Sequence, residues 1–359
     1  MTTTTPSPTA AGVILAIDLG RYKSVACAYD RATAGTRFHT LDSTRAEVVR
    51  LFARYPDATV VIEACANAGW VHDLAVAHGL AVKVANTNGE AWKFKHLKRK
   101  TDRDDAQRLA ELEALGQLPT VALPDPATRQ RRALIAHRQA LVGRRTATQN
   151  RIRALFAAQG LPSPRGHRAW TATGLDGLDR QAKPLADCAP DELWRGLLHL
   201  ALADYHHLLA LVDQAEAALD RLAAADPATQ LLETAPGVGR RTAEAVAAHL
   251  GDPRRFASGK QVGAFAGLVP RQYQSGESDR KGRITRRGPS VLRKLLVECA
   301  WAALRYNAWA RATYARLTRG GVTRKKPAIV ALARRLLVRL WAMLRDGQPW
   351  RPDPRPAAP

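Results

Sequence analysis

The hydrophobic pattern of this chain changes near residue 123. Before that point, three apolar or alternating segments have the length of strands and are separated by turns: 13–18, 24–30 and 37–41. The segments that follow alternate between helical spacing and the composition of buried strands: 45–55 and 69–79 for helices, 59–65 and 80–86 for strands. This order predicts a strand meander followed by alternating helices and strands. We therefore expect an α/β domain over residues 12–122.

Beyond the proline-containing linker at 123–128, apolar residues recur with the spacing of long helices. The first helix has a seam with one residue in every seven: Leu134, Leu141, Thr148 and Leu155. A second seam has 4-3-4-3 spacing: Leu208, Val212, Ala215, Leu219 and Leu222. Residues 161–192, between the two, are rich in Gly, Pro and Asp and are predicted to be a long connection. We expect a coiled-coil-like helical region over residues 123–225, whose helices pair either within one chain or between subunits.

Shorter helices are predicted from residue 226 onward. The stretch "QLLETAPGVGRRTAEAVAAHLGD" indicates a helix, a glycine turn and a second helix, as in helix-hairpin-helix modules. A loop rich in Gly, Ser and Arg is expected at 271–289, followed by helices with apolar periodicity at 291–318 and 325–346. Together these segments predict a mainly α C-terminal domain over residues 226–347.

The chain is strongly basic, with 55 Lys and Arg residues against 32 Asp and Glu residues and a formal net charge of +23 at pH 7. A charge of this sign and size favours a polyanionic partner, and nucleic acid is the usual one. We therefore expect a protein that binds nucleic acid.

The remaining composition predicts an intracellular, cytoplasmic protein. No apolar run reaches the ~18 residues that span a bilayer, and the N-terminal residues lack the basic and apolar regions of a signal peptide. The four cysteines lie far apart and form no C-x-x-C pair, which argues against a zinc site or a disulfide framework. The Thr/Pro-rich residues 1–11 and the Pro-rich residues 348–359 are expected to be disordered tails.

Four acidic residues have the positions of a metal site. Asp18 and Glu63 end two predicted strands, whereas Asp102 and Asp105 lie three residues apart at the start of a predicted helix and share one of its faces. Carboxylates from two strands and one helix suit Mg²⁺, which prefers oxygen ligands. Divalent metal ions held in this way stabilise phosphodiester chemistry.

Simpler interpretations exist for each acid. Asp18 suits a turn cap, Glu63 suits an ion pair with an arginine, and Thr101 with Asp104 has the spacing of a capping box. The order of strand, strand and helix, together with the basic charge, favours the metal site and leaves Asp104 outside it.

Three groups of basic residues are predicted to contact phosphates. The first precedes the acidic helix: Lys98, Arg99 and Lys100. The second is Arg240 with Arg241, beside backbone N–H groups at a helix N-terminus, where a plain tight turn is an equally good interpretation. The third surrounds Ser275: Arg271, Arg280, Lys281, Arg283, Arg286 and Arg287. From the residues alone, this loop favours phosphate contact over catalysis, because no histidine lies nearby to take the proton of the serine.

Five stretches in this order resemble an insertion-sequence transposase family whose members join a RuvC-like DEDD domain to a C-terminal serine domain. The stretches are "AIDLG", "VIEAC", "KTDRDDA", "PGVGRRTAEAV" and "FAGLVPRQYQSG…GRITRRG", and the resemblance spans roughly residues 13–345. Piv-type DNA invertases share this layout. The resemblance implies an RNase H/RuvC-like fold for the α/β domain, and it implies DNA as the substrate.

The resemblance also implies roles for individual residues. The acidic tetrad falls on Asp18, Glu63, Asp102 and Asp105, which would hold Mg²⁺. The nucleophile falls on Ser275, which would form a phosphoserine–DNA intermediate and release a 3′-hydroxyl. A bridge RNA as guide and a homo-oligomer, a dimer or a tetramer, are further implications.

The serine loop departs from the usual form of the family. The residues after the serine and glycine are Glu277, Ser278 and Asp279, so that Ser278 supplies a second hydroxyl. Two other functions fit the same residues: a RuvC-like endonuclease that activates water, such as a junction resolvase, and a non-catalytic nucleic-acid-binding protein.

Overall fold

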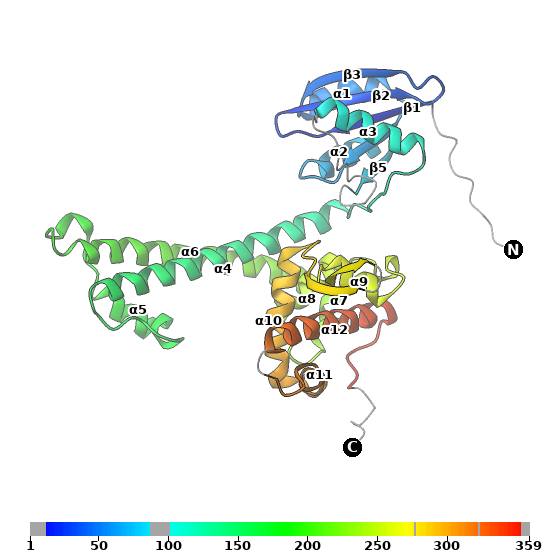
Figure 1. The fold of residues 1–359 in the computed structure, drawn as a ribbon. Coiled ribbons are helices and arrows are strands. Elements are labelled where there is room, and N and C mark those ends of the chain that lie inside the picture. Colours follow the sequence, from blue (N-terminus) through cyan, green and yellow to red (C-terminus); the bar gives the residue numbers. More distant parts are fainter. Residues whose placement is uncertain (1–11, 87–100, 276–277, 322–323, 353–359) are drawn as a thin grey trace. The chain divides into compact units, whose positions relative to one another are not determined.

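The computed structural model describes residues 12–86, 101–275, 278–321 and 324–352. Two compact units, residues 1–129 and 130–359, divide the chain (Figure 1). Each is described by itself. Among the described residues, no helix is long and apolar enough to cross a bilayer.

The N-terminal unit contains a five-stranded sheet in the order β3-β2-β1-β4-β5. The strands are β1 (Val13–Asp18), β2 (Lys23–Asp30), β3 (Thr36–Asp42), β4 (Thr59–Glu63) and β5 (Ala81–Ala85). The first three form an antiparallel meander, and β4 and β5 continue the sheet in parallel with β1. All five strands were predicted, and so were α1 (Arg45–Arg54) and α2 (Ala68–Ala77). The mixed α/β character of this region is therefore confirmed.

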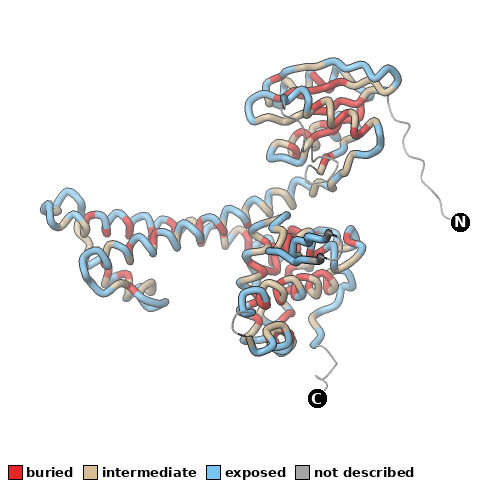
Figure 2. The backbone as a smooth tube through the Cα atoms, viewed as in Figure 1, coloured by how far each residue is buried: buried red, intermediate tan, exposed pale blue. Residues whose placement is uncertain are grey.

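Helices cover both faces of the sheet because alternate residues of a strand point to opposite sides. On one face, Leu15 and Ile17 of β1 belong to a core with residues of α1 and α2, such as Phe52 and Val71. On the other face, Ile14 and Ala16 pack with α3 (Asp102–Ala114) through Ala106, Leu109 and Ala110. Figure 2 shows buried residues along the central strands.

Two long helices, α4 (Pro126–Ala158) and α6 (Leu193–Ala224), pair within the chain. Arg138 forms an ion pair with Glu216, and Thr148 donates a hydrogen bond to Asp204 at 2.8 Å. Since the partner number falls as the α4 number rises, the helices are antiparallel. Their contact includes five of the nine predicted seam residues: Leu134, Leu141, Leu208, Val212 and Ala215. Of the two pairings that the sequence left open, within one chain or between subunits, the structure has the pairing within one chain.

The prediction for this region was wrong at two points. Leu222 is 45% exposed and Ala223 is buried instead, because a helical stripe continues from Leu219 by four residues rather than three. Residues 161–192 are not a plain connection, since they contain α5 (Ala172–Asp179). Leu175 of α5 packs in a cluster with Phe156 of α4, which a composition rich in Gly, Pro and Asp does not reveal.

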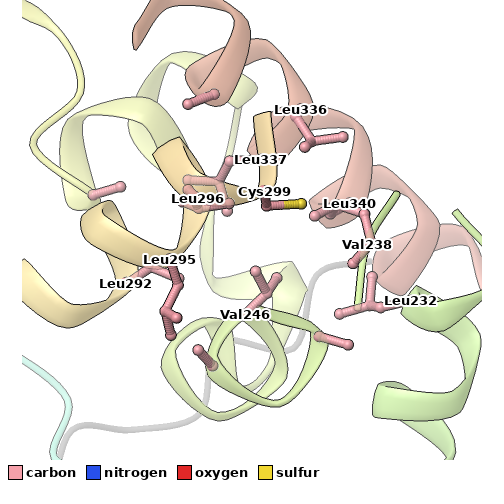
Figure 3. Packing of buried hydrophobic residues seen from close by; sticks show 14 of the residues in the cluster. Leu232, Val238, Val246, Leu292, Leu295, Leu296, Cys299, Leu336, Leu337 and Leu340 are labelled. Carbon is pink, nitrogen blue, oxygen red and sulfur yellow. The ribbon is translucent and has the colours of Figure 1, made fainter. Parts of the chain in front are cut away.

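The C-terminal core is helical, as predicted. It is built from α7 (Pro227–Glu233), α8 (Arg240–Leu250), α9 (Gly259–Phe265), α10 (Ser290–Tyr306), α11 (Ala308–Thr318) and α12 (Lys325–Asp346). Figure 3 shows Val246 of α8, Leu296 of α10 and Leu337 of α12 among the side chains of this core, all without exposed surface. The predicted single helix at 291–318 is two helices, because Asn307 ends α10 and its side chain caps α11 by accepting a hydrogen bond from Ala310 N.

Residues 271–289, predicted to be a loop, contain a β-hairpin instead. Strands β6 (Pro270–Ser275) and β7 (Ser278–Ile284) are antiparallel neighbours. The sequence hides them because polar and charged residues occupy both faces, so no alternation of apolar residues appears.

The first five residues of the predicted C-terminal tail are ordered against the core. Residues 348–352 were expected to belong to a disordered tail, but Trp350 contacts the ring of Trp309 with a centroid separation of 5.5 Å. The backbone N–H of Trp350 also donates to Thr234 at 3.0 Å. Burial of this aromatic ring holds the segment against the core.

Candidate active site

Asp18 and Glu63 lie at one edge of the sheet. Ile17 pairs with Ile62 in the parallel β1–β4 ladder, and Asp18 and Glu63 are the next residues of these strands. Neighbouring strands are ~4.8 Å apart. Ala16 and Val61 point to the face that α3 covers. Asp18 and Glu63 come two residues later on the same strands, so both acids project to that face. Both are partly exposed.

The first turn of α3 lies toward the same edge. Near the other end of the helix, the buried Glu113 pairs with Arg31 at 3.1 Å and with Lys83 at 2.7 Å. Arg31 directly follows β2, whose last residue pairs with Val13 at the start of β1. Helix α3 therefore runs opposite to β1. Its rise of ~16 Å from Asp102 to Glu113 matches the ~16 Å length of β1.

Asp102 and Asp105 continue the buried stripe of α3 toward its N-terminus. The stripe consists of Ala106, Leu109, Ala110 and Glu113, and residues three or four positions earlier share its face. Asp105 is partly exposed and Asp102 is exposed. The backbone thus brings all four predicted acids to the α3 side of one sheet edge.

Asp104 has a different position, in a capping box. Its Oδ2 accepts hydrogen bonds from Thr101 N at 3.0 Å and from Thr101 Oγ1 at 2.7 Å, while Asp104 N donates to Thr101 Oγ1 at 3.3 Å. The capping interpretation is therefore correct for Thr101 and Asp104, and it involves neither Asp102 nor Asp105.

The carboxylates do not form a ready metal cluster. Within residues 12–86, 101–275, 278–321 and 324–352, no three His, Cys, Asp or Glu side chains are arranged to hold a metal ion. The predicted phosphate contacts Lys98, Arg99 and Lys100 lie outside the described residues.

Asn67 and Ser43 position the acids, and sequence reasoning missed both. The carbonyl oxygen of Gly20 accepts hydrogen bonds from Asn67 Nδ2 and Ser43 Oγ, each at 2.9 Å. The turn requires glycine, since a Cβ at position 20 would lie 2.0 Å from the Lys23 carbonyl oxygen. The Asn67 bond ties the loop after β1 to the loop after β4, and the Ser43 bond ties it to the residue after β3. Both bonds help to fix the end of the strand that carries Asp18. An asparagine just before a helix suggests an N-cap, but this side chain caps no helix N–H.

The glycine turn of the helix–turn–helix packs against α10. Gly237 has a φ of +86°, and a Cβ there would lie 2.6 Å from Ala303 Cα. The carbonyl oxygens of Pro236 and Gly237 accept hydrogen bonds from Asn307 Nδ2 and Cys299 Sγ. This turn is therefore built for close packing of α7 and α8 on α10.

Arg240 and Arg241, predicted to bind phosphate, are engaged with carboxylates. Arg240 pairs with Asp220 and with Glu233, each at 3.2 Å. Arg241 also pairs with Asp220, and its Nη1 lies 3.1 Å from Glu244 Oε2. Internal acids thus offset the charge of both arginines.

Glu244 is fully buried, and burial raises its pKa to about 7, although Arg241 opposes this shift. Within the described residues, neither of its carboxylate oxygens accepts a hydrogen bond. A raised carboxyl pKa means that the folded state holds the proton more tightly than the unfolded chain. The contribution of Glu244 to the stability is therefore fully present below about pH 4.5 and is lost as pH rises through about 7.

We expect Glu244→Gln to stabilise the protein at pH 8 and to change little at pH 5. With a pKa raised from 4.5 to about 7, the buried carboxylate lowers the free energy of unfolding by about 3 kcal/mol at pH 8. The neutral amide of glutamine has no such cost. Urea unfolding at both pH values measures the difference. Glu298→Gln, at a 57% exposed position of α10, is the control; an equal gain in this variant would contradict the role of burial.

Ser275 lies at the tip of the β6–β7 hairpin. It is the last residue of β6 and pairs in register with Ser278, the first residue of β7. Residues 276–277 lie outside the described residues. The six predicted basic residues of this segment are exposed: Arg271, Arg280, Lys281, Arg283, Arg286 and Arg287. No ion pair found in the described part of the chain involves any of them. The acids belong to the N-terminal unit and Ser275 to the C-terminal unit.

Comparison with known proteins covers both units. Residues 229–315 match the family model described as "Transposase IS116/IS110/IS902 family". Residues 15–158 match the model for DEDD transposases of the IS110 type, described as "Transposase". The first match contains the hairpin, and the second contains all four acids.

Individual relatives extend over nearly the whole chain. The transposase for insertion sequence element IS1111A of Coxiella burnetii is 30% identical over 94% of this chain and 91% of its own length. A probable family 20 transposase of Pseudomonas aeruginosa is 32% identical over 86% of this chain and 90% of its own length. The pilin gene-inverting protein of Moraxella bovis is 36% identical over 33% of this chain and 38% of its own length.

Proposed function

Because the chain belongs to the IS116/IS110/IS902 family of transposases, and is therefore an enzyme of DNA transposition, we propose that it cuts and rejoins DNA through a covalent bond between Ser275 and a phosphate. The hydroxyl oxygen attacks a phosphodiester; one P–O bond forms, the bond to the 3′-oxygen breaks, and the serine proton is balanced by the proton that the 3′-hydroxyl gains. Because the phosphoserine keeps the energy of the ester, reversal of the attack by another 3′-hydroxyl reseals the DNA.

The β6–β7 hairpin is the observation that carries this proposal. It presents Ser275 at its tip, and exposed cations follow its strands and its base, with Arg280 and Lys281 nearest to the tip. Guanidinium groups bind phosphate through paired N–H donors, and they stabilise the negative charge that develops during attack. The contrast with Arg240 and Arg241 supports this assignment, because those arginines have acidic partners within the fold.

The acidic edge of the N-terminal unit supports a second part of the proposal. Oxygen ligands from Asp18, Glu63, Asp102 and Asp105 match the ligand preference of Mg²⁺, and their common side of the sheet fits a shared metal site. When bound, such an ion neutralises charge on the phosphate oxygens. The chain itself contributes the ligands and their positioning through Asn67 and Glu113. With a meander and two parallel strands, the domain is proposed to be RuvC-like.

The family resemblance extends the proposal to partners. A bridge RNA would select the DNA sites by base pairing, since the exposed basic residues contact backbone without reading sequence. A homo-oligomer would supply acidic and serine domains from more than one subunit.

Covalent trapping tests the proposed function. The full chain is incubated with 5′- and 3′-labelled DNA that contains an element end, with the RNA transcribed beside the element and with Mg²⁺, and is then denatured. We expect one labelled DNA end to migrate with the protein and the other to be released with a free 3′-hydroxyl. Cleavage that leaves no DNA on the protein would instead identify a hydrolytic endonuclease.

A further inference from the structure

The C-terminal unit contains a groove of about 830 Å³ that the proposed chemistry does not use. Its lining comes from α9, from α12 and from the start of α11. Nine residues line it: Gly259, Lys260, Gly263, Val269, Trp309, Arg334, Arg335, Val338 and Arg339. Four are cations, one is a tryptophan and none is acidic.

Three of the four cations of this groove are available to an external anion. Lys260 and Arg335 are exposed and Arg334 is partly exposed, and no ion pair in the described part of the chain involves any of the three. Elsewhere in this unit, Arg131 and Arg138 pair with Asp226 and Glu216. A row of cations without acids is costly through mutual repulsion and is suited to phosphates.

Trp309 forms a fixed aromatic surface beside these cations. The guanidinium of Arg339 lies 4.7 Å from the centroid of the Trp309 ring and 4.0 Å from that of Trp350. Arg339 also donates a hydrogen bond to the carbonyl oxygen of Arg351 at 2.6 Å. These contacts hold Trp309 in one orientation, so that stacking a flat ring on it costs little conformational entropy.

Two glycines let α9 approach α12 closely beside the groove. A Cβ at Gly259 would lie 2.7 Å from Val338 Cγ1, and one at Gly263 would lie 3.2 Å from Arg334 Cδ. Because the positions are four residues apart, they share one face of α9. The helix therefore presents backbone rather than side chains, and Val269 and Val338 supply an apolar surface.

We propose that this groove binds a single strand of DNA, with phosphates at Lys260, Arg334 and Arg335 and an unpaired base on Trp309. Cations that follow the backbone and an aromatic ring that stacks a base are the two elements of single-strand binding. A base in a duplex is already stacked and paired, and cannot reach a tryptophan within a groove. The proposal rests on the proposed function only in taking DNA as the substrate.

The place of the groove in the chain fits a strand next to the cleavage point. Val269 immediately precedes β6, and β6 extends ~20 Å to Ser275. DNA leaving the groove along this strand would reach the hairpin tip. A cleaved strand must be held while its partner is exchanged, and the groove provides that contact.

Salt-dependent binding tests the groove. Fluorescence anisotropy of the full chain is measured with an oligothymidine of about 16 nucleotides, within the site sizes of single-strand-binding domains, in EDTA so that no cleavage occurs. Each lost phosphate contact lowers the slope of log Kd against log salt by about 0.7 for a single strand. We expect Lys260→Ala/Arg335→Ala to lower the slope by about 1.4, and Trp309→Ala to weaken binding about tenfold.

Matched controls separate the groove from general charge. Arg144→Ala/Arg151→Ala removes two exposed arginines from α4. This variant should keep most of the slope of log Kd against log salt that the parent protein has. Trp301→Ala removes a 46% exposed ring from α10 and should leave Kd unchanged. An equal loss of slope in both double variants would overturn the assignment. So would tighter binding of a duplex than of the oligothymidine, or tighter binding of oligouridine that the groove variants abolish. Failure of covalent trapping leaves this binding result intact, so the two proposals fail separately.

Discussion

Ser275→Ala is expected to abolish the covalent protein–DNA adduct and to lower strand cleavage by at least about 1000-fold, the loss typical of a removed nucleophile. Alanine keeps the β6 backbone but has no oxygen to attack phosphorus. Denaturing gels of the trapping reaction measure the adduct, and the rate of 3′-end release measures cleavage. The thermal unfolding of the variant should match that of the parent, because the hydrophobic core includes none of residues 270–283.

Ser278→Ala is the matched control for this substitution. Ser278 pairs with Ser275 across the hairpin, so both variants remove one hydroxyl from the same tip. Adduct formation should persist in Ser278→Ala. An adduct that survives Ser275→Ala and disappears in Ser278→Ala would move the nucleophile to β7, whereas full cleavage in both variants would contradict serine catalysis altogether.

The N-terminal sheet could be predicted because its information is local. Each strand is an apolar or alternating run bounded by turns, and burial of the central strands on both faces requires the apolar pattern. The convergence of Asp18 and Glu63 follows from the parallel pairing of β1 and β4. The direction of α3 does not follow from local sequence, since it depends on Glu113 meeting Arg31 and Lys83 across the fold.

The C-terminal features that the sequence predicted wrongly depend on contacts between residues distant in sequence. Asn307 ends α10 while its side chain also donates to Pro236 O, a partner that helical periodicity cannot reveal. The hairpin around Ser275 needs pairing of two polar strands. Arg240 and Arg241 have the composition of a phosphate site, and only the position of Asp220 on α6 shows that they have internal partners.

The net charge of +23 therefore overstates the surface available to nucleic acid. Arg131, Arg132 and Arg138 of α4 donate to acids or carbonyl groups within the C-terminal unit. The basic residues of the hairpin, and Lys260, Arg334 and Arg335 of the groove beside Trp309, have no ion pair among those found in the described residues. Cations without an internal acidic partner therefore indicate the nucleic-acid-binding surface better than the density of cations in the sequence does.

Asp18→Asn and Asp105→Asn are each expected to lower DNA cleavage on the order of 10³-fold, because loss of metal-borne charge neutralisation costs several kcal/mol. Asparagine keeps the size of the side chain and one oxygen but removes the negative charge that attracts Mg²⁺. Removal of divalent ions with EDTA should have the same effect on the parent protein. Titration calorimetry with Mn²⁺ provides a readout besides activity, and binding should weaken in both variants.

Asp104→Asn decides whether this loss reflects a metal site or only a general need for acidity at the start of α3. Asp104 lies between the two proposed ligands in sequence, but its carboxylate accepts hydrogen bonds from Thr101. Its replacement should cost about 1 kcal/mol of stability through the cap and change cleavage by no more than about twofold. If Asp104→Asn lost activity and Mn²⁺ affinity as strongly as Asp105→Asn, the face of α3 would not select the ligands, and the proposed tetrad would be wrong.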